Sequence, residues 1–327
     1  MTQPVLGIDI AKASFDVCLI IEGKNRQAEF ENNSSGFKKL SHWLGKHTPV
    51  KVHACLEATG QFGEALAEYL YQAGHMVSVV NPARIKAYGS SKLRRNKTDK
   101  ADAELIAQYC LREQPALWTP PPASFKDLQA LVRRYDDLQT TYQQEKNRLK
   151  SGTTQPVVVA DLKEHLAYLE EKLALILQAI QEHIQACPEL KQRQDLLLSI
   201  PGIGKLTASK LLGEIRDVCA FGDARQLAAY AGVTPRNFVS GTSICKKARM
   251  TKMGNANLRK TLYMPAISAK RYNPIIRAFC QRLLDAGLSP KQVIGAAMRK
   301  LLHLIFGILK SGKPFDPNFL QKKAFAS

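Results

Sequence analysis

Two aspartates three positions apart, Asp99 and Asp102, are the residues whose type and spacing point most directly to chemistry. Thr98, just before them, is a good N-cap, and the apolar spacing across residues 99–112 (DKADAELIAQYCLR) predicts a helix that begins there. Because positions i and i+3 share a helix face, the two carboxylates would lie side by side on the first turn. Such a pair repels unless a cation lies between its members, and a divalent metal is the usual one. For the pair alone a plainer interpretation stays open, in which acidic residues complement the helix dipole.

Two further carboxylates stand upstream at the ends of expected strands. Residues 4–10 (PVLGIDI) are typical of a buried strand with Asp9 near its end, and an apolar strand at 52–56 delivers Glu57. More strands are expected at 14–21, 26–30 and 76–80, and helices at 36–47 and 61–73. This alternation predicts an α/β domain with a central sheet. Since chemistry in such sheets gathers at strand ends, we expect Asp9 and Glu57 to lie near the aspartate pair.

Four carboxylates that converge in this way suit two Mg²⁺ or Mn²⁺ ions, which activate an attacking oxygen and stabilise a leaving one in phosphoryl transfer. The order of a strand Asp, a strand Glu and a helical Asp-x-x-Asp resembles the RuvC/ribonuclease H-like nucleases. Asp9, Glu57, Asp99 and Asp102 are therefore the candidate metal ligands. Taken singly, each also has a structural interpretation: Asp9 could cap a turn, and Glu57 could pair with a lysine.

The charge of the chain points to a polyanionic partner. Its 327 residues carry a formal net charge of +19, with 45% hydrophobic and 23% charged residues. A globular chain this basic usually meets nucleic acid. A membrane is the rival partner, but the longest apolar run, 293–309, is interrupted by Arg299, Lys300 and His303. The seven cysteines are scattered and form no CxxC pair, and the seven histidines have no ligand spacing, so we expect a cytoplasmic protein without structural zinc. The N-terminus leads straight into a strand, so no signal peptide is expected.

A proline-rich connector at 115–123 (PALWTPPPA) ends the first predicted domain, which spans residues 1–114. Ser124 is expected to cap a long helix at 125–150, and a second long helix follows from the break at 152–156 to about residue 186. That second helix has the heptad spacing of a coiled coil, carried by Leu162, Leu166, Leu169, Leu173, Ile176 and Ile180. We therefore predict a coiled-coil arm within residues 115–190, as an antiparallel hairpin or an oligomerisation arm.

The last predicted domain, residues 191–327, is mainly α-helical. It begins with SIPGIG at 199–204 and an expected helix at 206–215. An apolar-Pro-Gly-apolar-Gly turn between helices is the pattern of a helix-hairpin-helix motif, whose backbone N–H groups can grip a phosphate. Gly202, Gly204 and Lys205 are thus candidate nucleic-acid-binding residues, and an ordinary turn is the alternative. Further helices are expected at 257–269, 274–286 and 290–309.

A polar stretch at 233–253 surrounds Ser240 and Ser243 with cations. The candidate phosphate-binding side chains there are Arg236, Lys246, Lys247, Arg249 and Lys252. A serine within a ring of cations could attack a phosphodiester, but no histidine or carboxylate adjoins it in sequence to act as a base. Chemistry alone therefore favours a phosphate-binding loop over a nucleophile.

Several motifs together resemble a known family. GIDIAK (7–12), CLEATG (55–60) and NKTDKADA (96–103) resemble the RuvC-like domain of DEDD transposases. SIPGIG, AAYAGVTPRNFVSGTS (228–243) and MTKMGNANLRKTLYMPA (250–266) resemble the serine-bearing C-terminal domain of the same proteins. This is the IS110 family of insertion-sequence recombinases, to which the Piv-type DNA invertases are also similar.

The resemblance implies that Asp9, Glu57, Asp99 and Asp102 form the tetrad that binds Mg²⁺ or Mn²⁺. It also reverses the preference for the polar stretch: Ser240 becomes the favoured nucleophile, which links covalently to DNA, and Ser243 the fallback. A homo-oligomer (a dimer or tetramer) and a structured bridge RNA that pairs with donor and target DNA are implied as partners.

The sequence thus predicts a site-specific DNA transposase or recombinase, a DNA invertase included. A metal-only RuvC-like nuclease, such as a Holliday-junction resolvase, is the alternative enzyme. An architectural DNA- or RNA-binding protein with an inactive carboxylate site is the third.

Overall fold

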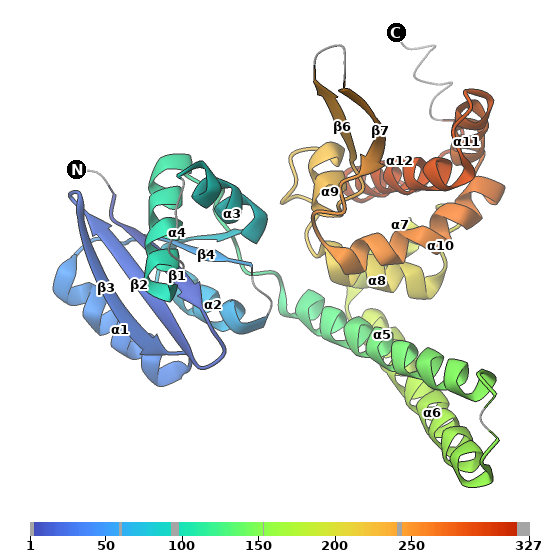
Figure 1. The fold of residues 1–327 in the computed structure, drawn as a ribbon, viewed down its shortest axis with the longest axis horizontal. Coiled ribbons are helices and arrows are strands. Elements are labelled where there is room, and N and C mark those ends of the chain that lie inside the picture. Colours follow the sequence, from blue (N-terminus) through green and yellow to red (C-terminus); the bar gives the residue numbers. More distant parts are fainter. Residues whose placement is uncertain (1–2, 59–60, 93–97, 153, 241–243, 319–327) are drawn as a thin grey trace. The chain divides into compact units, whose positions relative to one another are not determined.

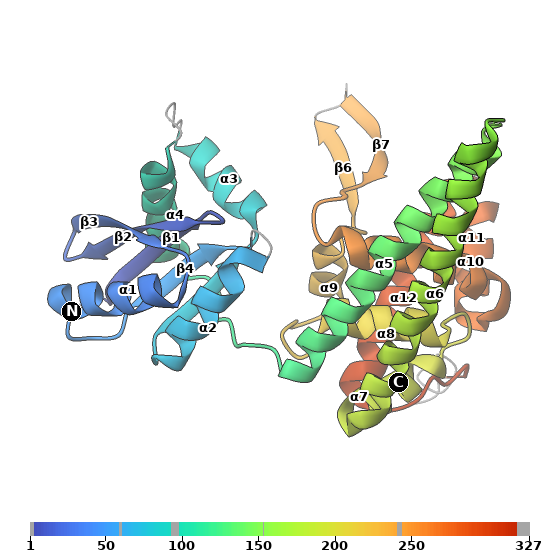
Figure 2. The ribbon, with the colours of Figure 1, turned by 90° about the horizontal axis from the view of Figure 1, so that it is seen from below.

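The computed structural model describes residues 3–58, 61–92, 98–152, 154–240 and 244–318, with the side chains of residues 61, 237–240 and 244–248 outside the description. The chain forms two compact units, residues 1–120 and residues 121–327. Each unit is described by itself, and Figures 1 and 2 show the arrangement of elements within each.

The first unit is built on a five-stranded mixed sheet with the order β3-β2-β1-β4-β5. β1, β2 and β3 form an antiparallel meander, and β1, β4 and β5 run parallel to one another. A tight turn at Glu22 (φ 49°) and Gly23 (φ 77°) joins β2 to β3. The bounds are β1 Val5–Ile10, β2 Ser14–Ile21, β3 Lys24–Glu31, β4 His53–Glu57 and β5 Met76–Val80.

Helices cover both faces of this sheet (Figure 2). Side chains alternate along β1, so Leu6 and Ile8 pack with α1 and α2 on one face, whereas Val5 packs with α3 and α4 on the other. The bounds are α1 Ser34–His47, α2 Glu64–Gln72, α3 Pro82–Ser91 and α4 Asp99–Glu113, with a 3₁₀ turn η1 Gln61–Gly63 before α2. The predicted α/β domain is confirmed at this level, although α3 was not expected from the sequence.

The second unit is mainly helical. A long pair, α5 Ala123–Lys150 and α6 Pro156–Ala186, packs along its length as a helical hairpin (Figure 1). Three of the six heptad residues, Leu162, Leu169 and Ile180, are buried, and the other three are half-buried. α5 begins at Ala123, with Pro122 at the N-cap position and no side-chain cap, so the expected cap at Ser124 is wrong by two residues. Proline at the residue before the helix fixes the backbone that a capping side chain would otherwise hold.

The remaining elements are α7 Pro188–Leu198, α8 Lys205–Ile215, α9 Ala224–Tyr230, β6 Pro235–Ser240, β7 Ile244–Met250, α10 Ala256–Tyr272, α11 Pro274–Asp285 and α12 Pro290–Ser311. Of these, α7 and α8 pack against this hairpin, and α9, α10, α11 and α12 pack with α7, α8 or one another. One hydrophobic core joins Phe125 of α5 and Ile184 of α6 to α8, α10 and α12. The arm therefore shares a core with the C-terminal helices.

α12 is the central helix of that core. By length and composition it is the one helix in the described part of the chain that could cross a membrane, although Arg299, Lys300 and His303 interrupt its apolar run. However, Val293, Ala297, Leu301, Leu302 and Ile305 are fully buried within the unit. Its apolar character is thus explained by the core in which it packs.

Candidate active site

Asp9 and Glu57 lie at one edge of the sheet in the first unit. β1 and β4 are parallel neighbours, with Ile8 opposite Leu56, so the next residues, Asp9 and Glu57, lie together at the carboxyl ends of the two strands. Both carboxylates are half-buried. The sequence-based prediction for these two strand ends is therefore confirmed in its local structure.

α4 brings Asp99 and Asp102 to the same region of the sheet. Its first turn is capped as expected, because the Thr98 hydroxyl accepts a hydrogen bond from the Ala101 N–H at 3.3 Å. The helix lies directly on β1 at Gly7, where a Cβ would come within 2.2 Å of the Ala103 carbonyl oxygen and the Ala107 nitrogen. Because Gly7 and Asp9 face the same side of β1, this contact sets how closely the first turn of α4 approaches Asp9.

The charges of three aspartates interact at this edge. Burial, followed by the charges of Asp102 and Asp99, raises the pKa of Asp9 from 3.8 to about 6. The structure thus brings Asp9, Asp99 and Asp102 into electrostatic contact, with Glu57 on the adjoining strand.

Sequence reasoning missed a fifth carboxylate, Asp16. It is the direct cross-strand partner of Asp9 in the β1–β2 hairpin and is only 8% exposed. Burial raises its pKa, and so do the charges of Glu29, its partner on β3, and of Asp99, whereas Lys100 lowers it. The signal that could have found Asp16 is the register of a hairpin whose turn occupies residues 11–13. The row of carboxylates therefore extends from β1 to β3.

The oxygen-rich donor set suits Mg²⁺ or Mn²⁺ in its chemistry, since hard cations prefer carboxylate ligands. Repulsion among Asp9, Asp99 and Asp102 is the kind of strain that a cation relieves. Among the described residues, however, no three His, Cys, Asp or Glu side chains lie close enough together to hold an ion. The carboxylates gather at one place, but their side chains would have to turn toward a shared ion.

The second candidate centre is the β6–β7 hairpin, in a stretch for which the sequence suggested a loop. Ser240 is the last residue of β6 and pairs with Ile244, the first residue of β7 (Figure 1). Ser243 lies outside the described residues, as do the side chains of Ser240, Lys246 and Lys247. The antiparallel pairing of β6 with β7 places Ser240 at the opposite end of the hairpin from the Pro235–Met250 pair.

Cations line the base of this hairpin. Arg236 and Arg249 are cross-strand partners and both are exposed. Lys252 follows with a positive φ of 55°, and its N–H donates to the Gly232 carbonyl. Arg259 donates from Nη1 to the Ala231 and Lys252 carbonyls and so ties the end of the hairpin to α10. These side chains give the hairpin the positive charge that a phosphate contact needs.

The SIPGIG segment forms the turn between α7 and α8. Gly202 has φ +104°, and a Cβ there would come within 2.7 Å of the Ala269 nitrogen, so this glycine is required for packing against α10. Gly204 is the N-cap of α8, with no side-chain cap, and a Cβ there would meet nothing within 4 Å. Lys205 is exposed. The backbone at the start of α8 is thus sterically open at Gly204.

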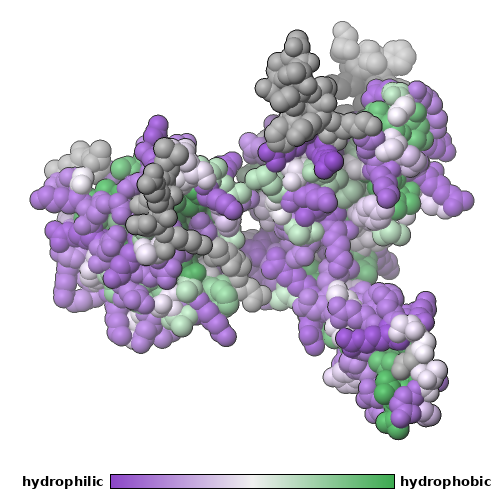
Figure 3. Space-filling view, viewed as in Figure 1, coloured by the Kyte–Doolittle hydropathy of each residue, from purple (hydrophilic) through white to green (hydrophobic). Residues whose placement is uncertain are grey.

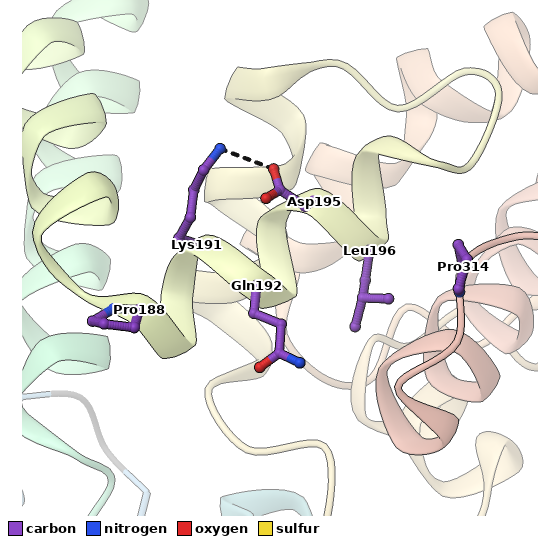
Figure 4. Close-up of a pocket in the computed structure, with 6 residues that line it drawn as sticks. All are labelled: Pro188, Lys191, Gln192, Asp195, Leu196 and Pro314. Atoms are coloured by element: carbon purple, nitrogen blue, oxygen red, sulfur yellow. Dashed lines mark hydrogen bonds and ion pairs between the residues drawn. The ribbon is translucent and has the colours of Figure 1, made fainter.

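A shallow apolar pocket of about 490 Å³ lies on α7 (Figure 4). Lys191 and Asp195 form an ion pair of 3.0 Å at its edge, and Pro314 closes one side. None of the predicted site residues lines it.

Comparisons with known proteins match two long segments of the chain. A sequence profile for the DEDD domain of IS110 transposases, described as "Transposase", matches residues 6–155, and one described as "Transposase IS116/IS110/IS902 family" matches residues 194–281. The pilin gene-inverting protein of Moraxella bovis is 37% identical over 320 residues, which cover 97% of this chain and 98% of that protein. The transposase for insertion sequence element IS1328 of Yersinia enterocolitica is 26% identical, over 79% of this chain and 81% of its own length.

Proposed function

Because this chain belongs to the IS116/IS110/IS902 family of transposases, enzymes that cleave and rejoin DNA, we propose that it is a site-specific recombinase with two chemical centres. The first is a divalent-metal site at Asp9, Glu57, Asp99 and Asp102, and the second is the nucleophile Ser240. The observation that carries this proposal is the convergence of Asp9, Asp99 and Asp102: burial, together with the charges of Asp102 and Asp99, raises the pKa of Asp9 to about 6. The sheet order supports a RuvC/ribonuclease H-like first unit.

Mg²⁺ or Mn²⁺, when bound, would activate an attacking oxygen and stabilise a leaving one. The protein supplies the rest of that site. β1 and β4 hold Asp9 and Glu57 at the sheet edge, and α4 holds Asp99 and Asp102 above it. Gly7 lets α4 rest directly on β1, which would bring the four carboxylates within reach of the same substrate phosphate once their side chains turn toward it.

The Ser240 hydroxyl would lose its proton to a base and attack a phosphodiester of the DNA. The bond from phosphorus to one neighbouring ester oxygen would break, which leaves one DNA end linked to the serine through its phosphate and the other end as a free hydroxyl group. A serine is a weak nucleophile without a base or metal to activate it. Activation would come from the carboxylate centre in an assembled homo-oligomer, since the two centres lie in separate units of the chain. Arg236, Arg249 and the neighbouring Lys246, Lys247 and Lys252 would neutralise the charge that develops on the phosphate.

The net charge of +19 supports contacts with long nucleic acids, DNA first and a structured bridge RNA second. The open backbone at Gly204 and the exposed Lys205 support a helix-hairpin-helix phosphate contact. The α5–α6 hairpin would serve as a coiled-coil contact between protomers, in a dimer or tetramer. Figure 3 shows hydrophobic surface at the far end of this arm, and Val157, near that end, is 75% exposed. Such an enzyme would work in the cytoplasm.

Inversion of a DNA segment is a specific form of this reaction, and the 37% identity to a pilin gene-inverting protein over nearly the whole chain favours it. An invertase recombines two sites in one molecule, whereas a transposase joins an element to a separate target. The two outcomes use the same site chemistry. A plasmid with two inverted candidate sites distinguishes them by the orientation of the recovered segment.

Denaturing electrophoresis of labelled DNA tests the proposal. Wild-type protein with Mg²⁺ should give a slow, protease-sensitive band, which is absent in Ser240→Ala and retained in Ser243→Ala. Asp9→Asn, Glu57→Gln and Asp102→Asn should each abolish recombination without unfolding, and EDTA should act as they do. A band that persists in Ser240→Ala moves the nucleophile elsewhere. Cleavage without any such band, equal in both proteins, supports the metal-only nuclease.

A further inference from the structure

A cavity of about 820 Å³ opens in the second unit between α8, α10 and α12. It lies at the base of the serine-bearing hairpin, because Met250, the last residue of β7, forms part of its wall. Gly295 of α12 is close to the same side chain: a Cβ there would lie 3.2 Å from Met250 Cε. Neither the carboxylate centre nor Ser240 contributes to this cavity.

The floor of the cavity is apolar, and one wall presents exposed hydrophobic side chains. The buried lining residues Pro265 and Met298 form this floor, and the half-buried Leu206 and Met250 add to the apolar lining. Tyr263, on α10, is 50% exposed although it lines the cavity. In the described part of the chain its ring has no aromatic or cationic partner, and its hydroxyl has no hydrogen bond. A tyrosine ring left open beside an apolar floor suits a flat, apolar face of a ligand.

The rim is positively charged. Four cations line the cavity (Lys210, Arg259, Lys260 and Lys291), against one carboxylate, Asp136. Lys210 is paired with Asp136, and Arg259 is engaged with backbone carbonyls. Lys260 and Lys291 are exposed, and no described residue pairs with either. Two lysines free to bind phosphate therefore flank an apolar cavity with an open aromatic ring.

We propose that this cavity binds an unpaired segment of nucleic acid, with a base against Tyr263 and its phosphates at Lys260 and Lys291. Stacking on an aromatic side chain needs an exposed base face, which a duplex hides. The positive rim favours this occupant over an apolar peptide. The inference rests on the proposed DNA-recombining function and adds a strand-binding site outside both centres.

The position of the cavity gives this site a role. Met250 and Ile244 are the two ends of β7, six residue steps or about 20 Å apart in an extended strand. Ser240 pairs with Ile244. A strand held in the cavity could therefore follow the hairpin to the serine, so the cavity would hold the separated strand a few nucleotides from the bond to be cut.

Fluorescence anisotropy with a labelled oligothymidylate of about 16 nucleotides tests the inference, and a duplex of equal length serves as the second probe. Tyr263→Ala should weaken single-strand binding about tenfold and duplex binding much less. Tyr168→Ala is the matched control, since Tyr168 of α6 is 53% exposed. Lys260→Gln and Lys291→Gln should each reduce the salt slope of single-strand binding by about 0.7, whereas Lys313→Gln should not.

Photocrosslinking supplies an independent measurement. An oligonucleotide that carries 5-iodouracil should crosslink to the α10 peptide around Tyr263 in the wild-type protein. If Tyr263→Ala matches Tyr168→Ala in affinity, or if the crosslinks fall outside the cavity lining, the inference is overturned. The covalent-adduct assay for Ser240 is scored separately, so a wild-type protein that binds strands here but forms no adduct refutes the proposed mechanism and leaves this site standing.

Discussion

Replacement of Gly7 by alanine should separate the two halves of the carboxylate centre. The added Cβ would lie 2.2 Å from two backbone atoms of α4, one at Ala103 and one at Ala107. Backbone atoms cannot turn away as the end of a flexible side chain can. Since ordinary contact begins at 3.4 Å, the helix must withdraw by the difference, 3.4 − 2.2 = 1.2 Å.

The size of the effect follows from that displacement. Overpacking of a core contact destabilises by about 1–3 kcal/mol. For a unit of 120 residues this lowers the melting temperature by about 4–12 °C. A shift of about 1 Å at a catalytic group can reduce the rate about 100-fold. Because Asp102 and Asp99 would move away from Asp9, the pKa of Asp9 should also fall from its value of about 6.

Three measurements check this expectation: calorimetric melting, strand cleavage in Mg²⁺ at a temperature below both transitions, and an NMR titration of the Asp9 carboxyl. Gly45→Ala is the matched control. Gly45 lies within α1, where a Cβ meets nothing within 4 Å, so this change should stabilise by about 0.5–1 kcal/mol. If Gly7→Ala melts, cleaves and titrates like wild type, α4 does not rest on β1 at this glycine.

Three other outcomes are expected. Without divalent metal the folded state binds more protons than the unfolded state between pH 3.8 and about 6, because the pKa of Asp9 is raised in the folded state. The free energy of unfolding should therefore fall as pH rises through that window. Urea titrations measure it, and Asp9→Asn should remove this pH dependence. Glu214→Ala removes the buried carboxylate that Arg133 and Asn255 share, and it should destabilise the fold by about 3 kcal/mol. In calorimetry the melting temperature should fall by about 6–12 °C, and a change within about 1 °C would show that this network contributes little. Gly204→Val has room to fold but should weaken DNA binding by crowding the start of α8, and unchanged affinity would make the SIPGIG segment a plain turn.

The sequence alone determined the local features of the carboxylate centre. Asp9 and Glu57 stand at strand ends because short apolar runs of the right length precede them, and Thr98 caps α4 through a contact only three residues long. The long helices α5 and α6 could also be predicted from the sequence, since heptad spacing and the break near Gly152 depend only on nearby residues. Such features need no knowledge of what packs against them.

Other features were decided by packing between distant segments. Asp16 faces Asp9 only because the β1–β2 register places it there. Gly7 matters because α4, about 100 residues later, rests on it, and Glu214 joins Arg133 across 81 positions. The cavity at Tyr263 combines side chains from four helices and one strand. Side-chain periodicity reports which residues are buried, but the partner of each buried face is chosen by how the elements fit together.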